Sequence, residues 1–195
     1  IVLFTADHGD LLGDFGAYFK CNFLEGSVRV PQIWRIPGAG GGERAQLVGL
    51  QDILPTLASL TNCPLDAEVQ GLDLSDALSR PDAPTRELFY SQCHDDGRQG
   101  AMVCDGRWKY CYQQWGAVEE LYDLGEDPQE LVNLALAGDG EQRVGPWRER
   151  LIAEARALGD LALLDEASPT GLASAPLDRD ALRKQPVGGM GWRWY

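Results

Sequence analysis

The chain opens on an apolar run, residues 1–4, that is closed at once by Thr5-Ala6-Asp7-His8. A short apolar run closed by small and acidic residues is typical of a buried parallel strand, whose carboxyl end is where open α/β sheets place their ligands. We therefore expect Asp7 and His8 to emerge at a ligand-binding end. A carboxylate oxygen and an imidazole nitrogen can bind one divalent ion if other ligands come from elsewhere. The alternative is a loop that caps the next helix.

The residues that follow carry a family pattern. Lys20 stands in the stretch after Asp7-His8-Gly9-Asp10, and Glu25-Gly26-Ser27-Val28-Arg29-Val30-Pro31 comes next. These residues closely resemble the sulfatase family of the alkaline-phosphatase-like superfamily. The resemblance covers about residues 1–158 and continues through several shorter motifs: Asp52-Ile53-Leu54-Pro55-Thr56, Gly71, Arg86-Glu87, Arg107-Trp108-Lys109-Tyr110, Glu120-Leu121-Tyr122-Asp123-Leu124, Asp127-Pro128 and Asn133-Leu134.

The resemblance implies an active site around three residues. Asp7 and His8 match the family's downstream metal ligands, and Lys20 matches the lysine that holds a sulfate oxygen. Calcium is the metal that the family usually binds. Because imidazole is a softer ligand than calcium prefers, manganese and zinc stay open as alternatives.

Other positions of the pattern are structural or altered. Glu25, Arg29 and Pro31 match a motif that shapes the segment after the lysine. We expect Glu25 and Arg29 to form an internal ion pair rather than to act in catalysis, because a charge near a core must be paired. Phe15 stands where members of the family often carry His, so any substrate contact made by that His is lost.

The family's nucleophile is missing from this sequence. It is a formylglycine made from Cys or Ser in a Cys/Ser-x-Pro/Ala-x-Arg motif, and none of the five Cys stands in such a motif. The nearest candidate, Cys63-Pro64, lacks the Arg. The family's first metal-binding aspartates also precede a strand like residues 1–4. We therefore expect a carboxy-terminal portion of a sulfatase, with the formylglycine supplied by an amino-terminal part.

The first 80 residues are expected to be the carboxy-terminal part of the sulfatase α/β catalytic domain. The resemblance implies that this part belongs to an alkaline-phosphatase-like α/β/α sandwich. Apolar residues at helical spacing after Asp52 predict a helix, with Asp52 as its amino cap and Pro55 in its first turn.

Residues 81–165 predict a small α+β subdomain. Pro81-Asp82-Ala83-Pro84-Thr85 marks the boundary, and beyond it the apolar period becomes that of strands. Four strands are expected to form an antiparallel sheet, and Asp105-Gly106 predicts a type I′ hairpin between two of them. The strands are placed at residues 88–90, 101–104, 108–112 and 121–124.

The last parts of the chain predict a helix and a tail. Pro146 should open the helix and Gly159 should close it, with Trp147, Leu151, Ile152, Ala155 and Leu158 on its apolar face. Residues 166–195 form a carboxy-terminal tail, and its final Trp192-Arg193-Trp194-Tyr195 should dock on the body or a partner. His94 is expected to be a loop residue, in a loop of residues 93–100 that borders the substrate cleft, and a metal ligand is the alternative.

Composition excludes some functions. A net charge of −13 argues against nucleic-acid binding, which needs a basic face. No run approaches the roughly 20 apolar residues of a membrane span. The Gly-rich residues 37–42 lack the Gly-Lys-Ser/Thr ending of a phosphate loop. Five Cys without paired short spacings predict mostly free, buried thiols, which favours the cytoplasm over a periplasmic or secreted location.

The function that the resemblance implies is metal-dependent hydrolysis of sulfuric esters, on a small-molecule or saccharide substrate. A phosphonate monoester or phosphodiester hydrolase of the same superfamily is an alternative, because its motifs look almost the same. A second alternative is that the chain, as it stands, is a noncatalytic fragment or interaction module. Apolar sheet edges left open in such a fragment would favour a homo-oligomer.

Overall fold

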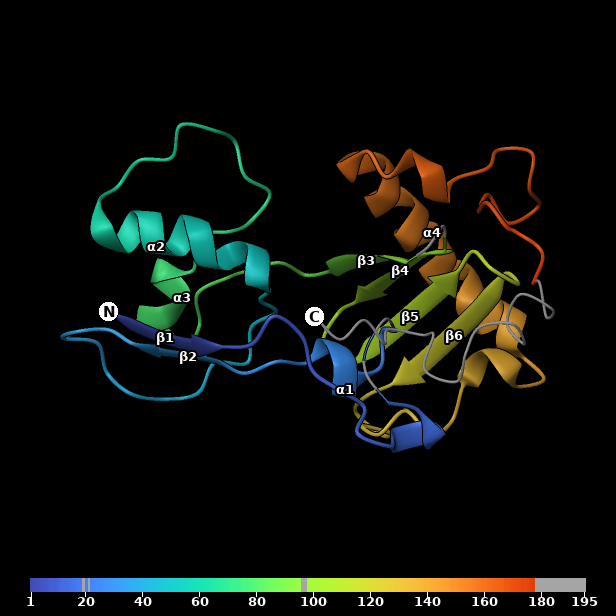
Figure 1. Ribbon diagram of the computed structural model, residues 1–195, viewed down its shortest axis with the longest axis horizontal. Helices are drawn as coiled ribbons and strands as arrows, with labels where there is room; N and C mark the ends of the chain where they lie inside the picture. The colour runs from blue at the N-terminus through green and yellow to red at the C-terminus, as the bar shows by residue number, and fades with distance from the viewer. Residues whose placement is uncertain (19, 21, 96–97, 178–195) are drawn as a thin grey trace. The chain divides into compact units, whose positions relative to one another are not determined.

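The computed structural model describes residues 1–18, 20, 22–95 and 98–177 (Figure 1). The chain forms two compact units. The first unit consists of Ile1–Asp7 and Val30–Phe89, and the second consists of His8–Arg29 and the chain from Tyr90 onward. The predicted domain boundaries after residues 80 and 165 stay predictions. The compact units of this chain need not coincide with the domains of a longer protein.

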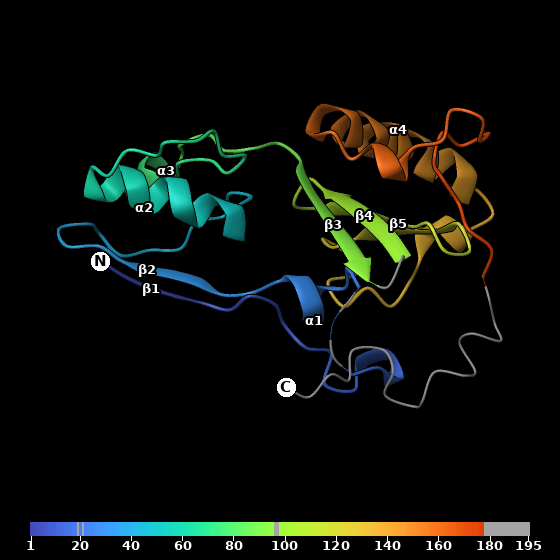
Figure 2. The ribbon, with the colours of Figure 1, turned by 45° about the horizontal axis from the view of Figure 1, so that its top comes forward.

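The first unit contains a two-stranded ladder covered on one side by helices. Strand β1 (Val2–Thr5) pairs antiparallel with β2 (Gln32–Arg35), with Leu3 opposite Trp34. The helices α2 (Ile53–Thr61) and α3 (Ser75–Ser79) lie on one side of this ladder (Figures 1 and 2).

The expectation of a buried parallel strand at residues 1–4 is wrong. The strand pairs with an antiparallel neighbour, and Val2 and Phe4 are 57% and 62% exposed. Side chains alternate between the two faces of a strand, so a one-sided ladder leaves every second one in solvent. A short apolar run does not by itself distinguish such a strand from a buried one.

Asp52 begins the helix region but does not cap α2 with its side chain. It is fully buried at the end of the 3₁₀ helix η2 (Leu50–Asp52), directly before α2. Its carboxylate accepts two hydrogen bonds from Arg86, at 2.6 and 2.7 Å, and others from the Leu72 and Gly49 amides. Asp52 therefore joins three segments of this unit.

The second unit is built on a four-stranded antiparallel sheet, as predicted. The order β3-β4-β5-β6 follows the chain: β3 (Phe89–Asp95), β4 (Arg98–Cys104), β5 (Trp108–Gln113) and β6 (Val118–Asp123). Both faces of β5 are buried, because Lys109, Tyr110, Cys111 and Tyr112 are each at most 2% exposed. Figure 2 shows α4 (Gly140–Leu158) on one face of the sheet and α1 (Glu25–Val28) on the other.

The turn between β4 and β5 differs from the predicted type I′ hairpin. Asp105 donates its backbone N–H to the Trp108 carbonyl at 3.1 Å, so the two central residues are Gly106 and Arg107. Only Gly106 has a positive φ, of 95°. A type I′ turn needs positive φ at both central residues, whereas Gly at the first position alone is the φ pattern of type II′. Asp105 stands before the turn, where its carboxylate accepts the Arg107 and Trp108 amides.

Helix α4 starts earlier than the sequence predicts. It begins at Gly140, six residues before Pro146, and ends at Gly159, which has the left-handed conformation expected of a closing glycine. The segment before the proline is held by the burial of Val144 and by an ion pair between Glu141 and the buried Arg148, which spans Pro146. These contacts offset the one helical hydrogen bond that Pro146 cannot donate. The predicted apolar face is correct at Leu151 and Ala155, but Leu158 is 40% exposed.

Smaller elements complete the second unit. They are the 3₁₀ helices η1 (Asp14–Gly16), η3 (Leu134–Leu136) and η4 (Leu161–Leu163). The predicted docking of Trp192-Arg193-Trp194-Tyr195 lies outside the described residues. Within the described part of the chain, none of the helices combines the length and apolar character that a membrane span requires.

Candidate active site

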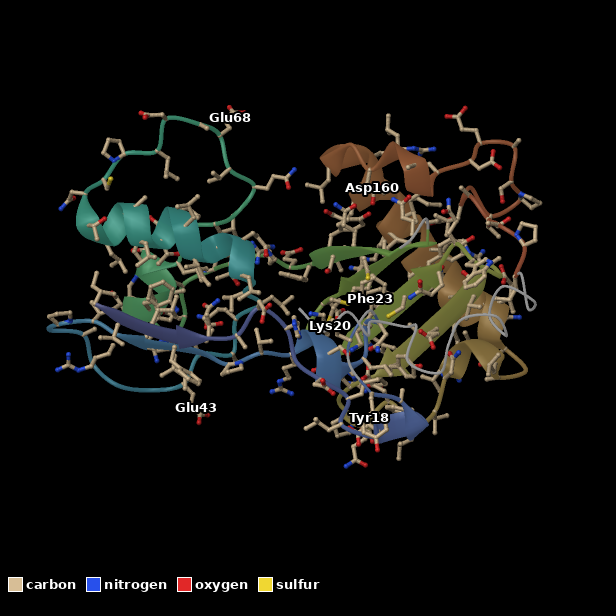
Figure 3. All side chains as sticks on the ribbon, viewed as in Figure 1. Tyr18, Lys20, Phe23, Glu43, Glu68 and Asp160 are labelled. Atoms are coloured by element: carbon tan, nitrogen blue, oxygen red, sulfur yellow. The ribbon has the colours of Figure 1, made fainter. Side chains whose placement is uncertain are left out.

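The three predicted site residues fall in both units, Asp7 in the first and His8 and Lys20 in the second. Asp7 is exposed and follows β1 after a single residue. His8 is half-buried, Lys20 is exposed, and the Lys20 Nζ contacts the His8 Nε2. Figure 3 labels Lys20 close to α1. The structure thus brings His8 and Lys20 together, although twelve residues separate them in the chain.

One hydrogen bond determines which nitrogen of His8 can act as a ligand. The Nδ1 lies 2.7 Å from the Gly9 carbonyl oxygen, which can only accept, so Nδ1 carries the proton. The Nε2 then keeps its lone pair and accepts from the Lys20 ammonium. A metal-ligating His is usually oriented in this way, with the other ring nitrogen donating to a carbonyl or carboxylate. His8 is therefore in the tautomer that a metal ligand at Nε2 requires.

The donor set fits a divalent ion only in part. Asp7 offers a hard carboxylate and His8 an imidazole nitrogen, and both types bind calcium, manganese or zinc to different degrees. Among the residues that the structure describes, no group of three or more His, Cys, Asp and Glu side chains gathers as a metal site would need. Among the described residues Asp7 and His8 are the two proposed ligands, and a complete site needs others.

The loop between His8 and Lys20 is strained. Asp10 accepts the Leu12 amide at 2.9 Å, and the backbone then takes a positive φ at Leu12, Gly13, Phe15 and Gly16. Positive φ costs about 1–3 kcal/mol at a residue other than Gly, and such strain gathers at ligand sites and active sites. Phe15, at the position where the family often has His, is 54% exposed.

A close backbone approach ties this loop to α1. Gly9 donates its N–H to the Ser27 carbonyl at 2.8 Å. A Cβ added at Gly9 would lie 2.0 Å from the Gly26 carbonyl oxygen, so only glycine fits. Leu11 and Phe23, each 3% exposed, anchor the loop on either side.

The ion pair predicted between Glu25 and Arg29 is present, but it is not internal. The two side chains are 3.7 Å apart and Arg29 is 79% exposed. The buried partner of Glu25 is Lys109, whose Nζ lies 2.8 Å from the Glu25 Oε1 and also pairs with Glu130. Sequence reasoning missed Lys109 and Glu130. One signal was available, because Lys109 alternates with the buried Tyr110 and must point to the opposite face of the sheet.

The two carboxylates keep Lys109 charged although it is buried. Burial alone would lower the pKa of Lys109, but the carboxylates of Glu25 and Glu130 outweigh it and raise that pKa. Burial raises the pKa of Glu130, and Lys109 and the Glu25 amide only partly oppose it. Lys109 therefore stays charged, between two carboxylates.

The remaining candidates are His94 and the cysteines. His94 falls within strand β3 rather than in a loop, and its side chain lies outside the described part of the structure. Cys104 and Cys111 are free, buried thiols, and burial raises the pKa of each. The expectation of mostly buried thiols is wrong for Cys63, which is exposed.

Comparison with known proteins assigns the family. The family described as N-sulphoglucosamine sulphohydrolase, C-terminal, matches residues 13–155. The chain belongs to the sulfatase family. Choline-sulfatase of Rhizobium meliloti is 36% identical over 139 residues, which are 69% of this chain and 27% of that protein. The chain thus spans about a quarter of the length of this relative and corresponds to the family's C-terminal portion.

Solved structures agree with this assignment. A Bacteroides thetaiotaomicron structure assigned to the sulfatases has a TM-score of 0.76 at 28% identity, over 86% of this chain and 39% of that one. The phosphonate monoester hydrolase of Agrobacterium radiobacter has a TM-score of 0.65 at 26% identity, over 89% and 38%. The family likeness confirms the predicted fold class, part of an alkaline-phosphatase-like α/β fold with a small α+β part carrying a four-stranded antiparallel sheet.

Proposed function

We propose that the complete protein containing this chain hydrolyses sulfate esters of small molecules or saccharides. The observation that carries the proposal is the contact between Lys20 and the His8 Nε2, which joins two of the three residues that the family pattern marks. The choline-sulfatase likeness supports the same reaction class. Nucleic acid is an unsuitable substrate for a chain with a net charge of −13.

In this proposal each of the three residues has one task. Lys20 would place its ammonium against a sulfuryl oxygen and neutralise the charge that builds up there. His8 and Asp7 would hold a divalent ion, calcium first and manganese or zinc as alternatives. When bound, such an ion supplies a Lewis acid that polarises an oxygen of the ester. The formylglycine of the family would come from the amino-terminal part.

The His8 Nε2 has one lone pair, so Lys20 and a metal ion cannot both use it. Ion binding would therefore release the Lys20 ammonium from His8. Lys20 lies on an exposed, glycine-containing loop, so its four-carbon side chain can turn toward a substrate.

A second candidate is a phosphonate monoester or phosphodiester hydrolase, and the likeness to the Agrobacterium enzyme favours it. Sulfate monoesters and phosphate diesters both carry one negative charge, so a single lysine serves either substrate. The complete protein should be assayed on an aryl sulfate and an aryl phosphonate. A higher kcat/KM on the sulfate supports the first candidate, and a higher value on the phosphonate overturns it.

Metal binding is tested with Asp7→Asn in the complete protein. The substitution removes the anionic charge of one proposed ligand, so the bound metal and the turnover should fall together, by at least about tenfold. Metal content is measured by mass spectrometry after dialysis. Asp14→Asn is the control, since it removes the same charge from an exposed position on the same loop. Unchanged metal content in Asp7→Asn would remove Asp7 from the site.

A further inference from the structure

A buried cluster of three charged residues lies on the α1 side of the sheet. Lys109 is 1% exposed and pairs with Glu25 at 2.8 Å and with Glu130, whose side chain is 2% exposed. Burying an ammonium group is costly even when it is paired, and apolar side chains of similar volume often stabilise a fold equally well. Stability alone is therefore a weak reason for this cluster.

The position of the cluster suggests another reason. Side chains of β5 alternate, so that Tyr110 contacts Glu119 near α4 whereas Lys109 contacts Glu25 on α1. Figure 2 shows these two helices on opposite faces of the sheet. Lys109 is thus the point at which the sheet holds the segment that carries His8 and Lys20.

Three hydrogen bonds connect this cluster to His8. Glu130 accepts the backbone N–H of Glu25 at 2.6 Å, so one carboxylate holds both Lys109 and the first residue of α1. Ser27, two residues later in α1, accepts the N–H of Gly9 at 2.8 Å. Gly9 in turn supplies the carbonyl that orients the His8 ring. The path from Lys109 to His8 therefore contains only ion pairs, hydrogen bonds and one four-residue helix.

We propose that Lys109 and Glu130 are positioning residues that act through Glu25. They hold α1 against β5, and α1 holds the His8 ring and the loop of Lys20 in place. Neither residue needs to touch the substrate. The inference rests on the proposed function, since it assigns His8 and Lys20 to the reaction site.

Hydrogen exchange of the complete protein, followed by mass spectrometry of its peptides, tests the attachment directly. Lys109→Met removes the cation, and Glu25→Gln keeps a hydrogen-bond acceptor while removing the charge. Both substitutions should speed exchange in peptides from residues 8–29 by about tenfold or more, because one charge-assisted link is lost. Exchange in α4 should stay within about twofold of the parent protein.

Arg148→Met is the matched control. Arg148 is also a buried cation with two carboxylate partners, Glu119 and Glu141, but it lies on α4. Its loss should speed exchange in α4 and leave residues 8–29 protected. Lys109→Arg should restore part of the protection, because it keeps the positive charge.

Enzyme kinetics test the positioning role independently of hydrogen exchange. On an aryl sulfate, Lys109→Met and Glu25→Gln should lower kcat about tenfold or more and change KM less, since misplaced groups act mainly in the transition state. If Lys109→Met does not fold, Glu25→Gln decides, because Glu25 is 24% exposed and tolerates the change more easily.

The outcomes separate the two proposals. Unchanged exchange at residues 8–29 in the folded variants, or an equal rise in Arg148→Met, would overturn the positioning role. Faster exchange at residues 8–29 in a protein that hydrolyses no sulfate ester would leave the positioning of this segment standing and reject the proposed function.

Discussion

Lys20 is an exposed cation whose predicted partner is the charge of a sulfuryl group. Lys20→Ala in the complete protein should therefore leave the bound metal in place and lower kcat by about 10²–10³, the usual loss when one charge-stabilising donor is removed. Steady-state kinetics and metal analysis of the same sample measure both quantities.

The control for Lys20 is Arg29→Ala, which removes another exposed cation that follows α1. It should retain turnover within about twofold, because surface ion pairs contribute little. Turnover unchanged in Lys20→Ala would exclude this residue from the reaction.

Gly9 has room for no side chain. In Gly9→Ala the new methyl group would lie 2.0 Å from the Gly26 carbonyl oxygen, a backbone atom that cannot turn away. We expect the free energy of unfolding to fall by about 1–3 kcal/mol, as in other overpacked sites, and the His8 loop to shift. Urea denaturation measures the loss. Gly40→Ala is the control, since no atom lies within 4 Å of its added Cβ; an equal loss in both would contradict the prediction.

At the scale of elements, the ion pair between Asp52 and Arg86 joins η2 to the segment that follows α3. Burial by itself raises the pKa of Asp52, but hydrogen bonds from Arg86 and from two backbone amides outweigh it and lower the pKa below its usual value. A carboxylate with a lowered folded pKa stabilises the fold above its unfolded pKa. That stabilisation is lost as the pH falls through the folded value.

Acid should therefore weaken the first unit below about pH 4, the usual pKa of an aspartate. Asp52→Asn should remove this dependence and cost about 3–5 kcal/mol at pH 7, because Arg86, whose side chain is only 14% exposed, loses its charged partner. Urea denaturation at pH 7 and pH 3 measures both effects. Asp76→Asn, in an exposed ion pair with Arg80, should cost less than about 1 kcal/mol. An equal pH dependence in the parent and in Asp52→Asn would refute the argument.

The elements differ in how far local pattern determined them. Alternating residues and turn signals were enough for the four-stranded sheet, because each strand packs its own side chains against the core. The prediction of a parallel strand at residues 1–4 was wrong, because the partner strand, β2, comes thirty residues later and no local pattern selects the pairing direction. Helix α4 starts before Pro146 because of the burial of Val144 and the Arg148–Glu141 ion pair, contacts that a proline rule does not include.

At the scale of the whole molecule, we expect metal binding to depend on residues outside this chain. Within the part of the chain that the structure describes, Asp7 and His8 are the two proposed ligands, whereas catalytic zinc sites use about three protein ligands and structural ones four. Losing outer-shell partners alone weakens a metal site by about 10–100-fold, so losing ligands should exceed 100-fold. Calorimetric titration of the isolated chain and of the complete protein with calcium and manganese measures the difference.

The isolated chain should also show no hydrolysis of an aryl sulfate, because it lacks the family's nucleophile motif. Tight one-to-one metal binding together with hydrolysis by the 195 residues alone would show that the site lies elsewhere.

The candidate site was predictable where the family pattern marks single residues, and not where distant segments meet. The pattern marks Asp7, His8 and Lys20, and the structure adds the contact between the last two. Glu130 carries no local signal, because its partners Glu25 and Lys109 come from two other parts of the chain. Only the folded structure joins them.

The burial of both faces of β5 also disfavours a shift in the register of this strand. A slip of one position would turn every side chain of this strand to the opposite face. It would carry the Lys109 ammonium away from Glu25 and Glu130 and leave these two carboxylates facing the Tyr110 side chain. An apolar strand could slip at little electrostatic cost. Here a slip would take Lys109 away from the buried Glu130 carboxylate and leave that charge without this partner, so the correct register is favoured over the slipped one.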